Sequence, residues 1–186
     1  MPAGDRLKSV LRIAIDMDDV IADTLAKYIR VCNSELGLAL GRSDFEGKNL
    51  SDVLRREHYP TIRALVDQED FFADLDVMPD SQEVIRKLTA RYEVFISSSA
   101  MEVPTSFMAK YHWLAKHFPF IPPGRIVFCG DKTILNADYL IDDRERHFEH
   151  FRGEGILFSA PHNVHVQGYR RVNGWRDVEA MLLEQR

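Results

Sequence analysis

Residues 11–18 read Leu-Arg-Ile-Ala-Ile-Asp-Met-Asp. The apolar run from Leu11 to Ile15 is short and nearly continuous, which is typical of a strand buried on both faces of a parallel sheet. It leads directly into two carboxylates, Asp16 and Asp18. In open α/β sheets the carboxyl ends of the strands are where ligands bind. The segment therefore predicts the first strand of a parallel sheet and a functional site at its end.

Four later segments repeat this pattern of an apolar run that ends in polar residues. They are residues 94–96, 126–128, 139–141 and 156–158. Helical patterns separate them: Asp80 can begin a helix with Glu83 at the capping-box position, Pro104 can begin another, and a last helix covers residues 175–183. Strands that alternate with helices predict a doubly wound α/β sheet with mainly parallel strands.

One stretch interrupts this alternation. Between Asp23 and Phe72 the sequence has helical patterns and no convincing strand. We expect residues 23–72 to form a small helical cap over the carboxyl edge of the sheet, while residues 1–22 and 73–186 form the α/β core domain. The cap helices are expected at residues 24–36, ended by Gly37, and at 51–58 and 61–67.

Polar side chains follow four of the predicted strands. They are Asp16 and Asp18, then Ser98, then Lys132, then Asp142 and Asp143. Because the carboxyl ends of parallel strands lie at the same edge of a sheet, these side chains can converge. Clustered carboxylates repel one another and raise each other's pKa values unless a cation offsets them, and hard oxygen ligands suit Mg²⁺. The set predicts a magnesium site at this edge.

The same set matches the needs of phosphoryl transfer. A carboxylate such as Asp16 can attack phosphorus and form an aspartyl-phosphate. A second carboxylate two residues on, Asp18, can protonate the leaving oxygen and then activate water. A hydroxyl and a lysine can hold phosphate oxygens and offset charge in the transition state. Uncatalysed hydrolysis of phosphate monoesters is extremely slow, so several electrostatic aids are expected.

Each piece has a simpler explanation when taken alone. Asp-x-Asp occurs in calcium loops, but the sixth and twelfth positions would here be Ile21 and Lys27, not Gly and Glu. A single lysine such as Lys132 is more often a solvated surface residue. Asp142 and Asp143 could cap a helix. The order of the pieces, each at a strand end, favours the functional interpretation.

This order of Asp-x-Asp, Ser, Lys and an acidic pair resembles the haloacid dehalogenase (HAD) superfamily. The sequence is more closely similar to the 5'(3')-deoxyribonucleotidases within this superfamily. The resemblance rests on residues 14–23, 94–99 and 131–143, and residues of the same type as in that family recur at 71–79, 110–113 and 158–163. The spacing from Lys132 to Asp142 matches that subfamily. The similarity extends from Leu11 onward and is weakest in the cap. It implies a HAD-like Rossmannoid core and Mg²⁺-dependent hydrolysis of nucleoside (deoxyribo)monophosphates to nucleoside and phosphate.

The resemblance also implies residue roles. Asp16 is the nucleophile and a metal ligand, and Asp18 is the acid/base whose backbone carbonyl contacts the metal. Asp143 is the other carboxylate ligand, with Asp142 close behind it. The implied substrate-binding residues are Ser98, Ser99, Lys132 and Phe72. The adjacent pair Phe71-Phe72 is equally typical of a core, so both interpretations of Phe72 stay open.

Three positions depart from the family pattern. Asp19 stands where many members have glycine, and Ala100 replaces a proline. Near Glu102 there is no lysine where vertebrate members place a second phosphate-binding cation. Two His-x-x-His pairs, at 147–150 and 162–165, are interpreted as helix and loop residues and not as a zinc site, and Arg170-Arg171 as a solvated pair.

Other functions remain open from the sequence. A phosphatase of the same superfamily could act on another small ester such as a sugar phosphate. A receiver domain phosphorylated on aspartate is disfavoured, because receivers place their acidic pair first. A catalytically silent binding protein would not need the complete set of polar residues.

The bulk composition narrows the partners. The chain has 186 residues and a formal net charge of -5, which argues against a nucleic acid polymer as partner but not against a small phosphate. No apolar run is long enough to span a membrane. Two cysteines, Cys32 and Cys129, exclude a disulfide scaffold and indicate a reducing cytoplasm. A homodimer stays open alongside a monomer.

Overall fold

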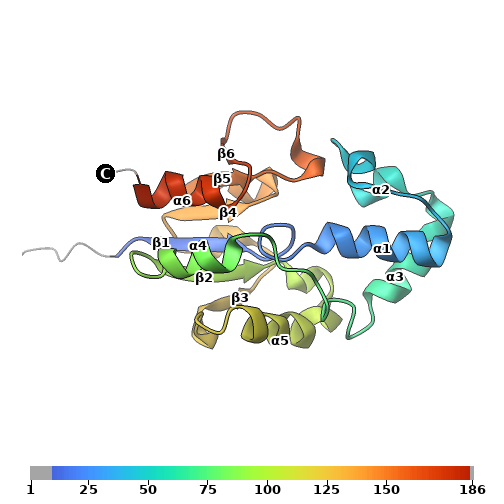
Figure 1. The fold of residues 1–186 in the computed structure, drawn as a ribbon, viewed down its shortest axis with the longest axis horizontal. Helices are drawn as coiled ribbons and strands as arrows, with labels where there is room; N and C mark the ends of the chain where they lie inside the picture. Colours follow the sequence, from blue (N-terminus) through green and yellow to red (C-terminus); the bar gives the residue numbers. More distant parts are fainter. Residues whose placement is uncertain (1–9, 185–186) are drawn as a thin grey trace, which may run out of the picture.

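The structure is a computed structural model that describes residues 10–184. Within those residues six strands form one sheet, in the order β3-β2-β1-β4-β5-β6, and every neighbouring pair is parallel (Figure 1). The strands are β1 (Arg12–Asp16), β2 (Glu93–Ser98), β3 (Ile126–Phe128), β4 (Tyr139–Asp142), β5 (Glu154–Phe158) and β6 (Arg170–Val172). The predicted doubly wound α/β fold is confirmed.

The helices lie between the strands and in one insertion. They are α1 (Thr24–Leu36), α2 (Leu50–Val53), α3 (Tyr59–Val66), α4 (Ser81–Leu88), α5 (Phe107–His117) and α6 (Trp175–Glu179), which continues as a π-helical turn over Ala180–Glu184. No helix among residues 10–184 is both long and apolar enough to cross a membrane.

The central strands separate two cores because successive side chains point to opposite faces of the sheet. Ile13 and Ile15 of β1 belong to the larger core, with side chains of α4, α5 and α6. Ala14 belongs to a smaller core with Phe148 and Phe151. Burying one such isoleucine side chain contributes about 1.5–3 kcal/mol. Both faces are therefore covered, which is why the strands read as apolar runs.

Strand β6 corrects one sequence interpretation. Arg170 and Arg171, interpreted as a solvated pair, lie in this edge strand, where Arg170 pairs with Ile156 of β5. The Arg171 guanidinium donates to the backbone carbonyls of Asn163 and Val166, at 2.9 and 2.7 Å. The solvated interpretation of Arg171 is wrong because its side chain has replaced water with backbone oxygens.

The ends of two helices test the predicted caps. Helix α1 begins after Asp23, whose carboxylate accepts from the Ala26 amide at 3.0 Å, and ends at Gly37 in the left-handed conformation, as predicted. The capping box predicted for α4 is wrong. Asp80 precedes that helix with φ 63°, but its side chain caps no amide and instead pairs with Arg176 at 2.8 Å.

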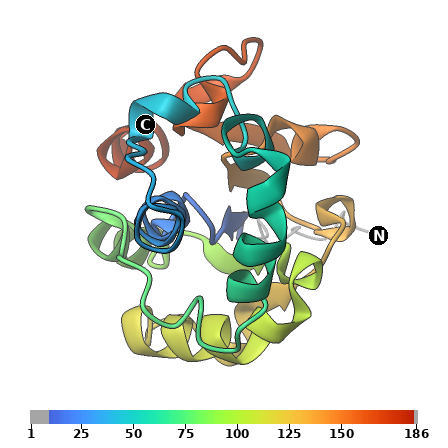
Figure 2. The ribbon, with the colours of Figure 1, turned by 90° about the vertical axis from the view of Figure 1, so that its right-hand side faces the viewer.

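The insertion after β1 is the predicted helical cap. The chain leaves and re-enters the core through a short stem, where Ala22 bridges Val77 and the Asp23 amide donates to the Asp76 carbonyl at 2.8 Å. Helices α1, α2 and α3 lie beyond the carboxyl ends of the strands (Figure 1), and seen from that side α3 crosses in front of the sheet (Figure 2). The cap bounds 23–72 stay a prediction.

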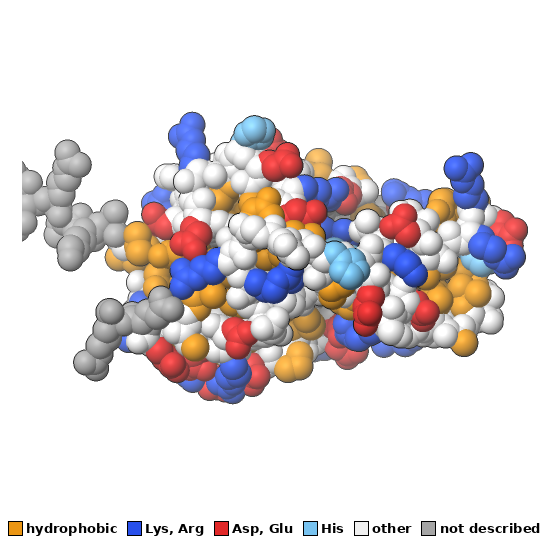
Figure 3. Space-filling view, turned by 90° about the horizontal axis from the view of Figure 1, so that it is seen from above, with side chains coloured by type: hydrophobic (Ala, Val, Ile, Leu, Met, Phe, Trp, Pro, Cys, Tyr) orange, Lys and Arg blue, Asp and Glu red, His pale blue; other side chains and the backbone are white. Residues whose placement is uncertain are grey.

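The surface shows mixed charge. On the face in Figure 3, acidic and basic side chains are interspersed among apolar ones. The cluster of carboxylates described next is buried at the strand ends instead.

Candidate active site

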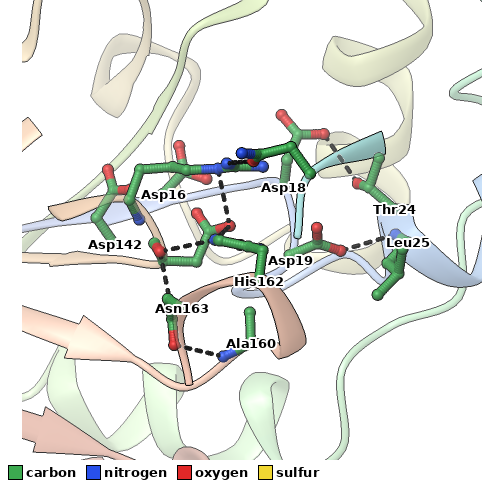
Figure 4. Close-up of polar contacts among 12 residues, drawn as sticks. Asp16, Asp18, Asp19, Thr24, Leu25, Asp142, Ala160, His162 and Asn163 are labelled. Carbon is green, nitrogen blue, oxygen red and sulfur yellow. Dashed lines mark hydrogen bonds and ion pairs between the residues drawn. The ribbon is translucent and has the colours of Figure 1, made fainter. Parts of the chain in front are cut away.

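Three carboxylates meet at the ends of neighbouring strands. Asp16 ends β1 and Asp142 ends β4, and Ile15 lies opposite Ile141 in the register, so the two strands stop at the same level. Oxygens of Asp16, Asp142 and Asp143 all lie within 4.8 Å of one another, and all three residues are buried. Figure 4 shows Asp16 and Asp142 side by side at this edge. The structure thus brings together the first and last acidic motifs.

Lys132 lies between two of these carboxylates. Its ammonium donates to Asp16 and, at 2.6 Å, to Asp142, and only 1% of the residue is exposed. Burial disfavours the charged ammonium, but the two carboxylates more than offset this and raise the pKa of Lys132. Lys132 is therefore a permanent cation at the back of the site.

The charge of this cluster fits a divalent cation. Three carboxylates, if ionised, face the buried ammonium of Lys132 and the Arg144 guanidinium 3.6 Å from Asp143, which leaves a net negative charge. Burial, opposed by Lys132 and aided by Asp142, raises the pKa of Asp16 to about 7. Burial and the neighbouring acids raise the pKa of Asp143 well above its ordinary value. A hard cation with oxygen ligands would remove this repulsion, so the residues present fit a metal ion.

Asp18 has a different environment from Asp16. It accepts hydrogen bonds from the Thr24 hydroxyl at 2.9 Å, the Ser98 hydroxyl at 3.2 Å and the Lys110 ammonium at 2.5 Å. Burial opposes ionisation, but Lys110 lowers the pKa of Asp18 below its ordinary value. Two carboxylates two residues apart thus have pKa values shifted in opposite directions, because Lys110 outweighs burial at Asp18 while burial outweighs Lys132 at Asp16.

Lys110 is the principal site residue that the sequence analysis missed. It lies in α5, is 4% exposed, and places its ammonium 4.6 Å from the centre of the Phe72 ring and 3.2 Å from the Ser98 hydroxyl. A signal existed: Lys110 occupies the apolar stripe of its helix, three and four residues before the buried Trp113 and Leu114. A lysine on such a stripe needs a buried partner, and Asp18 is that partner.

A cavity of about 320 Å³ opens beside these groups. Its walls include Asp16, Asp18, Phe72, Ser99, Lys110 and Asp143. Phe72 is both a buried residue that packs edge-on against Phe71 and a wall of this cavity. Ser98 faces Asp18 and Lys110, while the Ser99 hydroxyl, within the described part of the chain, has no hydrogen-bond partner. The arrangement places carboxylates, a hydroxyl without a partner among the described residues, and cationic side chains around one space.

The family profile for 5' nucleotidase, deoxy (pyrimidine), cytosolic type C proteins matches residues 8–186. The chain belongs to this family. The 5'(3')-deoxyribonucleotidase of Bacillus subtilis is 37% identical over 171 residues, which cover 92% of this chain and 98% of that protein. A Staphylococcus epidermidis protein provisionally given the same name is 45% identical over 168 residues, covering 90% and 93%. Like its family, the chain is an enzyme, a phosphoric monoester hydrolase.

Solved structures with low sequence identity share the fold. A haloacid dehalogenase-like protein from Agrobacterium tumefaciens superposes with a TM-score of 0.65 at 16% identity, over 93% of this chain and 97% of that one. A magnesium-bound HAD hydrolase from Bacillus subtilis gives 0.59 at 12% identity, over 93% and 98%. The HAD-like core expected from the motif order is thereby confirmed.

Asp19 shows how this member departs from the cytosolic type C pattern. Its φ of 57° is left-handed, a conformation that glycine adopts freely and aspartate tolerates. The Asp19 carboxylate accepts from the Leu25 amide at 2.7 Å, at the start of α1. The side chain gains a helix amide as partner, which offsets part of the cost of the left-handed backbone.

Two histidines of this nucleotidase-family site were also missed. His147 Nδ1 lies 2.8 Å from Asp142, and His162 Nε2 lies 3.3 Å from the carboxylate of Asp143. Burial, with Arg144 nearby, lowers the pKa of His162 to about 4, so this ring is neutral at pH 7. Each histidine supports one member of the acidic pair.

The mouth of the cavity connects core and cap. Arg144 donates to Asn49 of the cap at 2.5 Å and lies 3.6 Å from Asp143. Glu102, the acidic departure from the family pattern, pairs with Arg146 at 3.0 Å. Its charge is therefore offset by a cation, while Lys110 supplies a second ammonium from the helix that follows.

Proposed function

We propose that this enzyme hydrolyses nucleoside monophosphates, deoxyribonucleotides among them, through an aspartyl-phosphate on Asp16 and with Mg²⁺ as cofactor. The observation that carries the proposal is the pairing of two neighbouring carboxylates with two different buried lysines. Lys132 contacts Asp16 from the short helical turn that follows β3, and Lys110 contacts Asp18 from α5. A nucleophile and an acid/base are thus kept apart chemically within one cavity.

In the first half-reaction the Asp16 carboxylate attacks phosphorus, and the bond from phosphorus to the ester oxygen breaks. Asp18 gives its proton to that leaving oxygen. In the resting site Lys110 keeps Asp18 ionised. A phosphate dianion that enters the cavity competes for Lys110 and weakens this pairing, which raises the proton affinity of Asp18 when the acid is needed.

In the second half-reaction Asp18, now a carboxylate, takes a proton from water, and the water oxygen attacks the phosphorus of the aspartyl-phosphate. The bond from Asp16 to phosphorus breaks, which releases inorganic phosphate and restores the Asp16 carboxylate and the protonated Asp18. Ser99 and Lys110 line the cavity and hold phosphate oxygens through both steps. Lys132, which is bonded to Asp16 and Asp142, offsets charge behind them. Ser98 orients Asp18 and Lys110.

The cofactor proposal rests on the donor set. Asp16, Asp143 and the backbone carbonyl of Asp18 would hold Mg²⁺, with Asp142 behind them. When bound, Mg²⁺ supplies the positive charge that offsets the carboxylates and polarises the phosphoryl group.

A second cavity supports a nucleoside as the leaving group. It has a volume of about 380 Å³ and shares Tyr28, Glu102 and Val103 with the catalytic cavity. Its other walls are mainly apolar side chains of the cap, including Leu50, Leu54, Tyr59, Ile62 and Val66. An apolar and aromatic cavity next to a phosphate site suits a nucleobase better than a sugar. The names of the Bacillus and Staphylococcus relatives point to the same substrates.

Phosphate release tests the substrate. The purified chain with Mg²⁺ is offered 5' and 3' ribo- and deoxyribonucleoside monophosphates, with sugar phosphates as controls. We expect turnover of nucleoside monophosphates, with deoxyribonucleotides among the best substrates. Inert nucleotides together with turnover of a sugar phosphate would show that the substrate class is wrong and that the other superfamily alternative is right.

The compartment and assembly stay predictions. Both thiols, Cys32 and Cys129, are free and buried, which is compatible with the cytoplasmic location that we propose. Mass measurement in solution decides between a monomer and a homodimer.

A further inference from the structure

Asn163 is a fully buried side chain whose hydrogen-bonding capacity is completely used. It lies in the turn after β5, and its amide nitrogen donates to the backbone carbonyls of Asp143 and Phe158, both at 2.8 Å. Its amide oxygen accepts from the Ala160 amide at 3.2 Å (Figure 4) and from Arg171 at 2.8 Å. Two donors and two acceptor positions are all satisfied, which fixes the orientation of the amide.

The neighbouring residue reaches the same point. His162 Nε2 lies 3.0 Å from the Asp143 carbonyl and 3.3 Å from its carboxylate. Because both partners are oxygens, Nε2 must carry the hydrogen, and the partners thereby assign the tautomer. One turn of the chain thus donates to the Asp143 backbone from two consecutive side chains.

Arg171 fastens this turn to the sheet. Its guanidinium contacts the side chain of Asn163 and also donates to the backbone carbonyls of Asn163 and Val166. Arg171 lies in β6, the edge strand that pairs with β5. The contacts form a continuous path from an edge strand, through Asn163, to Asp143.

Asp143 needs these contacts to hold its position because the neighbouring carboxylates repel it. Its carboxylate lies among those of Asp16 and Asp142, within 4.8 Å, and like charges at that range repel. A ligand carboxylate that can rotate or retreat binds a cation more weakly than one that is held in place.

The geometry points to Asn163, anchored by Arg171, as the positioning residue that holds Asp143 ready for the metal ion. This inference rests on the proposed function, because it presumes that Asp143 binds Mg²⁺. Asn163 itself touches neither metal nor substrate and acts only through Asp143.

The test is calorimetric binding of Mg²⁺, without substrate, to the wild type and to Asn163→Asp. The substitution keeps the size and the acceptor oxygen but removes both donated hydrogen bonds. We expect Mg²⁺ affinity to fall roughly 10–100-fold, the usual effect of losing a partner of a metal ligand. The added negative charge alone would strengthen cation binding, so a loss reports lost positioning. At saturating Mg²⁺, kcat of the variant should approach the wild-type value, although its affinity for Mg²⁺ stays low.

Asn173→Asp is the matched control. Asn173 lies just beyond β6, contacts Ser159 and Asp177, and has no contact with Asp143 among the described residues. It should bind Mg²⁺ as tightly as the wild type. If Asn163→Asp does not fold, Arg171→Gln carries the test, since it leaves Asn163 in place and removes its anchor.

Unchanged Mg²⁺ affinity in a folded Asn163→Asp or Arg171→Gln protein overturns the inference and leaves the proposed function intact. A purely structural role would lower the free energy of unfolding in EDTA without weakening Mg²⁺ binding at a temperature where the variant is fully folded. Failure of the wild type to bind Mg²⁺ would overturn the proposed cofactor, and the inference with it.

Discussion

The ammonium of Lys110 lies 2.5 Å from a carboxylate oxygen of Asp18, although the two residues are 92 positions apart in the chain. One comes from a helix that packs on the sheet, the other from the loop after the first strand. The contact buries a cation that also faces the cavity. Lys110 is therefore placed to hold the acid/base before substrate binds and to hold phosphate afterwards.

Lys110→Met should lower kcat roughly 100- to 1,000-fold, the usual effect of losing one donor to transition-state charge. The apolar side chain still fills the space above Phe72, so the fold should persist. Lys116→Met in the same helix is the control, because Lys116 is exposed and lies outside the catalytic cavity. Steady-state kinetics that show equal kcat values for the two variants would contradict the role of Lys110.

Asp18→Asn should separate the two half-reactions. With a nucleotide, loss of the proton donor should reduce kcat by about 100- to 10,000-fold. With p-nitrophenyl phosphate, whose leaving group needs no proton, the first step should survive and water activation should fail. We therefore expect a burst of nitrophenol followed by slow turnover in stopped-flow measurements.

Asp23→Asn is the matched control for Asp18→Asn. Asp23 lies at the start of α1, where its carboxylate accepts from the Ala26 amide, and it does not line the catalytic cavity. It should keep wild-type kinetics on both substrates. A steady rate without a burst in Asp18→Asn, with kcat near that of the wild type, would show that Asp18 is not the acid/base.

The stability of the metal-free protein should fall as the pH rises from 5 to 8. Folding raises the pKa of Asp16 from 3.8 to about 7 and that of Asp19 to about 6, and it raises the pKa of Asp143. In this window these three carboxyl groups bind more protons in the folded state than in the unfolded state, so the free energy of unfolding decreases with pH. His162, whose pKa folding lowers from 6.5 to about 4, opposes this trend only below about pH 6.5. Each carboxyl group that is protonated in the folded state and ionised in the unfolded state lowers the free energy of unfolding by at most about 1.4 kcal/mol per pH unit. Asp18, whose pKa is lowered, changes the free energy of unfolding with pH only below its unfolded value of 3.8, outside this window.

Urea unfolding in EDTA at several pH values measures this slope. Asp143→Asn should flatten it, because one of the raised carboxyl groups is gone. Mg²⁺ should stabilise the wild type more at pH 8 than at pH 6, since protons compete with the metal for the same oxygens. Stability that rises with pH in EDTA would contradict the charge balance derived for this cluster.

Much of this site follows from sequence because strand ends are easy to recognise. Asp16, Lys132 and Asp143 each stand next to an apolar strand, and a parallel sheet brings its strand ends to one edge. Lys110 lies in the middle of a helix, where its place on the apolar stripe indicates burial but does not identify its partner. Its role depends on the packing of α5 against the sheet, which is tertiary information.

The missed strand and the wrong helix cap have related causes. Strand β6 has three residues, two of them arginines, so its local composition indicates a solvated segment. Arg171 is needed there for its contacts with a turn that precedes it in the chain. Asp80 has the residue type of a cap, but Arg176 of α6 competes for its carboxylate. In both cases a distant arginine overrides the local preference.

Tyr28→Ala should weaken nucleotide binding more than catalysis. Tyr28 borders both the catalytic cavity and the apolar one, so it is placed to contact the nucleoside. Loss of one aromatic contact with a base costs about 1–3 kcal/mol, so KM for a nucleotide should rise roughly 10-fold or more. The kcat/KM for p-nitrophenyl phosphate, which has no base, should change little.

Tyr169→Ala controls for the loss of a tyrosine. Tyr169 packs against Phe148 and borders neither cavity. Its KM values should match those of the wild type. An equal fall in kcat/KM for the nucleotide and for the nitrophenyl ester in Tyr28→Ala would contradict a contact between Tyr28 and the nucleoside.

The central claim is that phosphate is carried on Asp16. Rapid quenching of the enzyme during turnover of a nucleotide, followed by borohydride reduction and peptide mass spectrometry, tests it most directly, because borohydride converts an aspartyl-phosphate to homoserine. We predict substrate-dependent homoserine at position 16, with position 18 unchanged, and none without nucleotide. Active enzyme that yields homoserine at another position would contradict it, as would Asp18→Asn that yields none at position 16 after its burst with p-nitrophenyl phosphate.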